Sequence, residues 1–312
     1  MKKIIIVAAS LLLASLVFVY LLIPQKITAS KIFTFKAPML TVKRCFADSS
    51  IWSQWFPLQN SNSNHFSIAN YSFNNIHTND INSSNIVIKN DNYTLNSTVS
   101  FFPIQSDTVI VTWTFDMPAT QNPIKKITYY FEAKEIKTTL TDVLNHFKNF
   151  IEDDVKVYGM RVKETEVNDT CIITIKSQSS HYPTTQQVYE VVTQLKNYAT
   201  QSNATATNHA MFHITQVGDS SFYFMIGLPI NKRLNNNGNI AFKQMLPHGK
   251  FLVSDSIIGG VQKVTQQFLQ FEKYKADHKY ISPAIPFQLL ITDRSLQPDS
   301  SKWVTQFYYP VF

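Results

Sequence analysis

The sequence predicts an α+β protein in which two domains follow one apolar N-terminal helix. Three observations carry this prediction. Residues 171–312 read as one β-α-β-β unit used twice, residues 31–160 contain alternating strands followed by a helix, and residues 4–23 are continuously apolar. The predicted divisions are a transmembrane segment in residues 1–30, a first domain in residues 31–160 and a second domain in residues 166–312.

The apolar segment is long enough to cross a bilayer. Residues 4–23 carry no charge, and their polar members are Ser10 and Ser15. At about 1.5 Å per residue, a helix of this length spans a hydrocarbon core of roughly 30 Å. A cleaved secretory signal has a shorter apolar region and a small-x-small cleavage site, for which Thr28-Ala29-Ser30 is a poor candidate. We therefore expect a retained single-pass anchor, with a cleaved signal as the alternative, and both domains outside the cytoplasm in a periplasmic location.

The first domain shows the period-two alternation of half-buried strands. In residues 108–115, valine, tryptophan and phenylalanine alternate with threonine and isoleucine. Residues 127–134 alternate in the same manner, and residues 93–101 predict a weaker third strand. A helix is predicted over residues 140–151, because apolar residues recur there at helical spacing and Thr139 is placed to cap the helix.

The repeat in residues 171–312 is supported by its internal spacing. Tyr198 lies 14 residues before Phe212, and Tyr274 in the second copy lies 14 residues before Gln288. The copies are predicted as strand, helix, strand and strand over residues 171–177, 184–199, 211–216 and 222–230, and again over 251–257, 261–275, 286–292 and 302–311. Two such copies can pair about a pseudo-twofold axis and leave a groove between them, which is the predicted binding site.

The first domain resembles the polyketide-cyclase and lipid-transport-like family (SRPBCC, START-like). The resemblance is carried by KAPMLTVKRCFADSSIWSQWFP at Lys36–Pro57 and by the single long helix that closes the domain. It covers residues 31–160 and implies a helix-grip fold, with an antiparallel sheet curved around the helix and an internal cavity for apolar ligands. We interpret Trp52, Trp55 and Phe56 as core side chains that hold the short helix in place.

The second domain is similar to the GyrI-like small-molecule-binding family, which also forms the effector-binding half of some bacterial transcription activators. The resemblance is carried by HYPTTQQVYEVVTQLKNY, PAIPFQLLITDRS and WVTQFYYPV, which begin at residues 181, 283 and 303. It implies a duplicated β-α-β-β fold with acids on the strands that face the groove. This chain departs from that pattern, because Gln288 and Gln306 stand where the family commonly has Glu, and Leu290 stands where Tyr is common.

These departures bear on the ligand. A carboxylate in a groove attracts cations and can act as a general base, whereas a neutral amide does neither. Residues 171–312 also carry 12 basic and 7 acidic residues. We therefore expect a small apolar or aromatic ligand that is neutral or anionic.

Strand parity and the repeat correspondence predict which residues line the groove. Residues two apart on a strand share a face, and the repeat pairs Phe212 with Gln288 and Met225 with Gln306. The alternative is that these faces pack under the helices. The predicted ligand-binding residues are Phe212, Ile214, Tyr223, Met225, Gln288, Leu290, Gln306 and Tyr308.

The sequence contains no convincing catalytic, phosphate-binding or metal-binding motif, so neither a cofactor nor a metal is expected. Gly-x-Ser-x-Gly and phosphate-loop motifs are absent from the sequence. His209 and His213 fall on a predicted strand, where residues four apart are separated by about 13 Å, too far to share a metal. Cys45 and Cys171 predict no disulfide. No run of five basic residues occurs, so nucleic acid is not an expected partner.

The leading hypothesis is a membrane-anchored, non-catalytic protein that binds or senses a small molecule in the groove. Two alternatives stay open. One is a hydrolase of small electrophilic molecules, an activity to which some GyrI-like proteins are similar, although the two glutamines weaken that reading. The other is a protein-interaction module that uses the same groove. The sequence leaves the oligomeric state undetermined.

Overall fold

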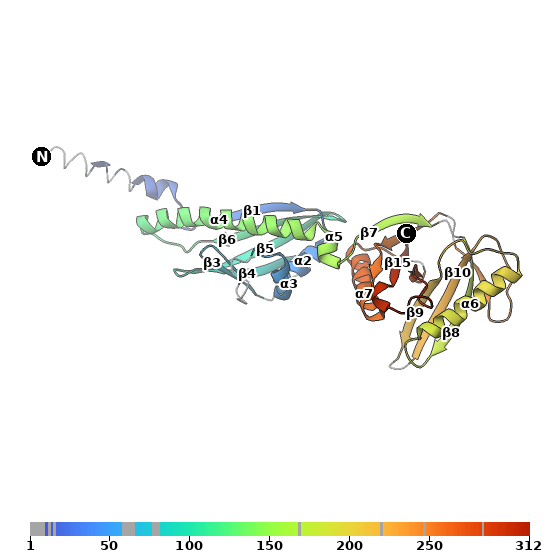
Figure 1. The fold of residues 1–312 in the computed structure, drawn as a ribbon. Helices are drawn as coiled ribbons and strands as arrows, with labels where there is room; N and C mark the ends of the chain where they lie inside the picture. Colours follow the sequence, from blue (N-terminus) through green and yellow to red (C-terminus); the bar gives the residue numbers. More distant parts are fainter. Residues whose placement is uncertain are drawn as a thin grey trace. The chain divides into compact units, whose positions relative to one another are not determined.

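A computed structural model describes residues 10–11, 14, 17–57, 66–76, 82–167, 170–218, 221–245, 248–282 and 284–312 (Figure 1). The chain divides into two compact units, Met1–Asp153 and Asp154–Phe312. Each unit is built on an antiparallel sheet with helices, so the mixed α+β prediction is confirmed. Half of the predicted transmembrane stretch, residues 4–23, lies outside the described residues. No helix within the described part of the chain is both long and apolar enough to cross a membrane.

The first unit contains a six-stranded sheet in the order β1-β6-β5-β4-β3-β2. Every neighbouring pair is antiparallel. The predicted strand over residues 108–115 is confirmed as β6, in which every second side chain is buried. The strands are β1 (Thr28–Phe35), β2 (Phe66–Ile68), β3 (Tyr71–Ile76), β4 (Ser83–Lys89), β5 (Thr94–Gln105) and β6 (Thr108–Asp116).

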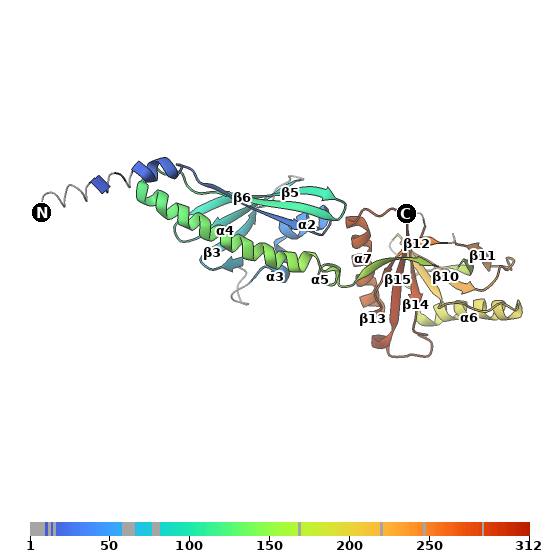
Figure 2. The same ribbon diagram turned by 90° about the horizontal axis from the view of Figure 1, so that it is seen from above.

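Three helices pack on this sheet: α2 (Met39–Ala47), α3 (Ser49–Trp55) and α4 (Pro123–Ile151), which runs along it (Figure 2). The tryptophans of α3 are core side chains, as predicted. Trp52 and Trp55 are buried and donate from Nε1 to the carbonyl oxygens of Phe46 and Cys45, at 3.1 and 3.3 Å. The ring of Phe147 on α4 lies 4.4 Å from that of Phe46 and 4.7 Å from that of Trp55. Aromatic side chains therefore fill the interior where α2, α3 and α4 meet.

The strand predicted over residues 127–134 is wrong, because this segment is the first half of α4. Asn122 caps the helix by accepting hydrogen bonds from the backbone N–H groups of Ile124 and Lys125, and Pro123 occupies the first turn, where proline is well tolerated. Thr139 is not a cap. It lies inside the helix, where its hydroxyl donates to the carbonyl oxygen of Glu135.

Glu132 in α4 provides a test of the first unit's interior. Its Oε2 atom is buried. Burial raises the pKa of its carboxyl group, the nearby hydroxyl of Tyr93 opposes this shift, and the charge of Glu135 adds to it. Because the folded state then binds more protons than the unfolded state, the free energy of unfolding falls as pH rises from the unfolded pKa through the folded one. We expect Glu132→Gln to stabilise this unit by about 0.5–1.5 kcal/mol near pH 7, since an amide carries no charge to bury.

Urea unfolding at about pH 4 and about pH 7 would measure this effect, with tryptophan emission as the signal, since three of the four tryptophans lie in the first unit. The gain should shrink at the lower pH, because protonation of wild-type Glu132 increases as the pH falls. Asp142→Asn, on an exposed position of the same helix, is the matched control. A less stable Glu132→Gln protein near pH 7 would contradict the prediction.

The second unit contains a larger sheet in the order β11-β8-β10-β9-β14-β15-β12-β7, with β13 paired to β15. The predicted repeat is visible in this order, since β8-β10-β9 on one side of the centre corresponds to β12-β15-β14 on the other. At the centre, β9 pairs with β14 and Phe212 lies opposite Gln288, the two residues that the sequence spacing equates. The strands are β7 (Val162–Val167), β8 (Cys171–Ser179), β9 (Met211–Val217), β10 (Ser221–Ile230), β11 (Ala241–Gln244), β12 (Gly249–Ser254), β13 (Ile257–Ile258), β14 (Phe287–Leu290) and β15 (Val304–Val311).

Helices α6 (Thr185–Gln201) and α7 (Val261–Asp277) cover one face of this sheet, with the short helices α5 (Asp154–Tyr158) and η1 (Ser300–Lys302) beside them. We call this side the helix face. Thr184 and Gln187 form a capping box that starts α6. The core under α6 includes Phe212, Ile226 and Leu290. The core under α7 is a separate cluster that includes Phe271 and Phe307. Among the helices of the second unit that the structure describes, none covers the opposite face of the sheet.

Candidate functional site

The face of the second sheet opposite the helices forms the candidate site, and we call it the groove face. Residues directly opposite one another in antiparallel strands point to the same side. Met211 is opposite both Gly227 and Leu289, and Met225 is opposite His213. Met211 and Leu289 belong to an apolar cluster distinct from the two cores under the helices. These side chains therefore share the groove face.

A cavity of about 880 Å³ opens on the groove face. This volume falls within the range of about 300–1,000 Å³ typical of small-molecule sites. Both repeats contribute to its wall, as the repeat predicts. The lining residues are Ile172, Thr174, Lys176, Met211, His213, Met225, Gly227, Lys243, Gln244, Met245, His248, Gly249, Lys250, Phe251, Ala284, Ile285, Phe287, Pro310, Val311 and Phe312.

The floor of the cavity is aromatic and rich in methionine. The ring of Phe287 stacks on that of Tyr308, with centroids 5.1 Å apart and planes 5° from parallel. Phe251 packs against Phe287 at 6.0 Å. Met211 and Met225 add flexible, polarisable side chains that can adapt to different guests. The floor is suited to a flat apolar or aromatic ligand.

The wall of the cavity carries positive charge. None of the described lining residues is Asp or Glu. Lys250 pairs with Glu164 at 2.9 Å, and His248 lies 3.2 Å from Glu166. Lys176 and Lys243 take part in none of the ion pairs formed by the described residues, so their charges are available to a ligand.

His213 lines the cavity and is held by two hydrogen bonds. Its Nδ1 atom lies 2.7 Å from the carbonyl oxygen of Pro286, and its Nε2 atom lies 2.9 Å from the hydroxyl of Thr215. A carbonyl can only accept, so Nδ1 carries the proton and Nε2 accepts from Thr215. Burial lowers the pKa of the imidazole. The described residues include no group of three His, Cys, Asp or Glu side chains able to hold a metal.

The lowered pKa of His213 predicts a pH dependence of stability. The unfolded state takes up a proton at the ordinary histidine pKa of about 6.5, whereas the folded state resists protonation until lower pH. The contribution of neutral His213 is therefore present above that value and is lost as pH falls through the folded pKa. Thermal melts between about pH 7.5 and pH 5 should show a smaller loss of melting temperature for His213→Gln than for wild type. An identical loss in the two proteins would contradict this prediction.

Four of the eight predicted ligand-binding residues lie on the groove face. Met225 lines the cavity. Tyr308 packs against the apolar cluster of the floor. Gln306 also faces this side, but its amide is engaged internally, since Nε2 donates to the carbonyl oxygen of Ser254 at 2.8 Å and Oε1 accepts from the hydroxyl of Tyr308 at 3.1 Å. Tyr223 is on the same face two residues from Met225 and is half exposed.

The other four residues, Phe212, Ile214, Gln288 and Leu290, lie on the helix face, and their predicted face is wrong. Phe212 and Leu290 are buried under α6, and Ile214 packs against the same core. Gln288 is opposite Phe212 and Phe307 and is buried with its Oε1 atom unpaired. The physical reason lies in β14, which is buried on both sides. A strand without alternation does not reveal which of its residues face the groove.

Sequence reasoning missed most of the positively charged wall. Lys243 lies on β11, a four-residue strand that was not predicted, and pairs across to Ile172. Lys176 is opposite Met225, so the parity of β10 would have indicated it once the pairing of β8 with β10 was known. Met211 and Phe287 were missed because they are the immediate neighbours of the residues chosen on β9 and β14.

Comparisons with known proteins give distant likenesses. No protein-family model matches the chain, and no curated protein sequence matches it. Among solved structures, EcmrR in the cryo-EM structure of an EcmrR–DNA complex is similar at 12% identity, over 62% of this chain and 72% of that chain, with a TM-score of 0.44. SAV2435 bound to tetraphenylphosphonium is similar at 14% identity, over 49% and 94% of the two chains, with a TM-score of 0.32. A START superfamily protein from Mycobacterium smegmatis is similar at 12% identity, over 40% and 97%, with a TM-score of 0.30. All three TM-scores are below 0.5, and none of these proteins decides what this chain binds.

Proposed function

We propose that the second unit binds or senses a small apolar or aromatic molecule, neutral or anionic, in the cavity of the groove face, without chemical turnover. One observation supports this most strongly: an apolar cavity of about 880 Å³ has lysines but no acid among its described lining residues. Burial of the ligand's apolar surface supplies affinity, at roughly 25 cal/mol per Å². Lys176 and Lys243 favour a negative group over a positive one.

We also propose that residues 4–23 anchor the chain in a membrane as a single span, with both units outside the cytoplasm. The support is the uncharged apolar run in the sequence, whose length matches the thickness of a bilayer core. Such an anchor would hold the binding unit close to a membrane, where apolar molecules are concentrated.

Three probes that share one ring system test the proposed ligand class. We expect 2-naphthoate to bind the full chain in detergent at least as tightly as 2-naphthylmethanol, and about tenfold more tightly than 2-naphthylmethylammonium, because the wall is cationic. Isothermal titration calorimetry would measure the three affinities. Tightest binding of the ammonium probe, or no binding of any probe at millimolar concentration, would contradict the proposal.

A pair of variants locates the binding. Met225→Asp places a carboxylate in the cavity and should weaken 2-naphthoate about tenfold. Tyr223→Asp places the same group on the same strand and face, two residues away and outside the lining of the cavity, and should change affinity by less than about twofold. Equal losses in the two variants would place the bound probe elsewhere.

A further inference from the structure

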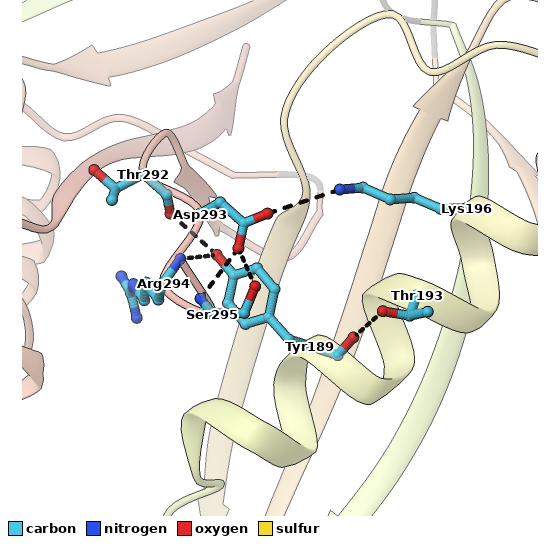
Figure 3. Close-up of polar contacts among 7 residues, drawn as sticks. All are labelled: Tyr189, Thr193, Lys196, Thr292, Asp293, Arg294 and Ser295. Atoms are coloured by element: carbon cyan, nitrogen blue, oxygen red, sulfur yellow. Dashed lines mark hydrogen bonds and ion pairs between the residues drawn. The ribbon is translucent and has the colours of Figure 1, made fainter. Parts of the chain in front are cut away.

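A second polar site lies on the helix face of the second unit, away from the groove face. Figure 3 shows it where the turn after β14 meets the side of α6. The hydroxyl of Tyr189 on α6 accepts a hydrogen bond from the backbone N–H of Arg294 at 2.8 Å and donates to the carbonyl oxygen of Thr292 at 3.0 Å. This pair of bonds fixes the turn to the helix and fixes the position of Arg294.

Arg294 is buried, and none of the ion pairs between described residues involves it. Its side chain is 9% exposed. Nη2 donates to the hydroxyl of Thr305 at 2.7 Å, and the guanidinium lies 4.8 Å from the centre of the Trp303 ring. Its Nε atom is buried with no hydrogen-bond partner. The stacking offsets part of the cost of burying this charge, which is several kcal/mol for an unpaired ion.

The neighbouring carboxylates are engaged with other groups. Asp293 accepts from the backbone N–H and hydroxyl of Ser295, and its other oxygen lies 3.9 Å from Nζ of Lys196 (Figure 3). Glu190 accepts from the amide of Gln186 at 2.9 Å. No hydrogen bond or ion pair within the described residues joins Arg294 to an acid. Burial lowers the pKa of the guanidinium, and the groups that oppose this shift are the side chains of Tyr189 and Tyr182.

Arg294 also lines a depression of about 660 Å³ on the surface beside α6. The depression offers hydroxyl and amide groups for a polar ligand. Its lining residues are Thr185, Gln186, Tyr189, Glu190, Thr193, Gln194, Arg294 and Ser295. Glu190 is the one acid among them. Its carboxylate repels a ligand with two negative charges more strongly than a ligand with one.

We propose that Arg294 anchors a second binding site, on the helix face, for a small ligand that carries a single carboxylate group. The guanidinium supplies the charge-assisted hydrogen bonds that a carboxylate accepts. The hydroxyls of Thr185 and Thr193 and the amides of Gln186 and Gln194 supply contacts for the rest of the ligand. This site is independent of the groove face. Thr305, which accepts from Arg294, lies opposite Leu290, and Leu290 belongs to the core under α6.

Arginine side-chain NMR on the full chain in detergent tests this site directly. The chain has four arginines, Arg44, Arg161, Arg233 and Arg294, so the four Nε–Hε signals can be assigned by single Arg→Lys variants. Sodium acetate is titrated against sodium chloride at constant ionic strength. We expect the Arg294 signal alone to shift, with saturation below about 100 mM acetate, and inorganic phosphate to act more weakly. A shift that chloride reproduces, a shift shared by all four arginines, or stronger binding of phosphate would overturn the proposal.

Two variants complete the test. Arg233 also stacks on an aromatic ring, that of Phe242 at 5.6 Å, but it is exposed, so Arg233→Lys is the matched control and should leave the acetate response of Arg294 unchanged. Glu190→Gln removes the competing charge and should tighten acetate about two- to fivefold. If acetate bound more weakly to Glu190→Gln than to wild type, the depression beside α6 would not be the carboxylate site. The response of Arg294 to acetate is read from wild type, so a poorly folded Arg294→Lys protein does not prevent the test.

Discussion

Replacing Phe212 by alanine should lower the free energy of unfolding of the second unit by about 3–5 kcal/mol. Phe212 is 1% exposed and belongs to the core under α6. Its removal leaves a cavity in a closely packed interior, and a domain of this size has only about 5–15 kcal/mol in total. Met225→Ala on the groove face should cost about 1 kcal/mol or less, since Met225 is partly exposed and lines an existing cavity.

Hydrogen exchange of peptides from β9 and β10 would measure this difference, because it reports on the second unit alone. Exchange in Phe212→Ala should accelerate by roughly two to three orders of magnitude relative to Met225→Ala, as expected from their difference in stability. The two residues lie on neighbouring strands of the same sheet, so the comparison separates the two faces. If the two substitutions lowered the free energy of unfolding equally, or if Met225→Ala lowered it more, Phe212 could not belong to the core under α6. That outcome would contradict the register of β9 with β10 and β14.

The repeat could be predicted from the sequence because its signal is long-range and regular. The spacing that equates Phe212 with Gln288 matches the centre of the sheet, where these residues pair across β9 and β14. Both helices of the repeat were predicted to within a few residues, since each has a clear apolar stripe, and α6 starts at a complete capping box.

The long helix of the first unit shows where the same reasoning fails. Residues 127–134 alternate in polarity as a strand does, yet Asn122 and Pro123 supply a helix start. The alternation arises because this end of α4 is largely exposed: Ile127, Tyr130 and Phe131 are among its exposed apolar side chains. When a segment does not face a core, the spacing of its apolar residues does not indicate its secondary structure reliably. The helix start at Asn122 and Pro123 was the stronger indication.

The candidate sites were only partly predictable. Periodicity places residues on a strand, but the face they occupy depends on strand pairing, and β14 contains no alternation that could reveal it. The positive wall combines Lys176 and Lys243 from strands that become neighbours only in the folded sheet. Arg294 lies in the turn after β14, and its burial depends on Trp303 and Thr305 of a later segment. Each of these features arises from tertiary contacts rather than from local sequence.

Reversing both groove lysines, Lys176→Glu with Lys243→Glu, should weaken binding of 2-naphthoate about 10- to 100-fold. Each unit charge near contact distance contributes roughly 1 kcal/mol in water-like surroundings, and reversal both removes an attraction and adds a repulsion. For the same reason, affinity for 2-naphthylmethylammonium should rise. Both lysines are exposed, so the variant should fold with nearly wild-type stability.

The matched control reverses two exposed lysines that do not line the cavity, Lys232→Glu with Lys279→Glu. The net charge of the chain then changes by the same amount, and any long-range effect on an anionic probe is common to the two double variants and is screened by salt. Calorimetric titration of both probes into both proteins gives four affinities. The proposal requires a selectivity change confined to the Lys176/Lys243 protein; the same change in both proteins would mean that overall charge, and not the wall of the cavity, selects the ligand.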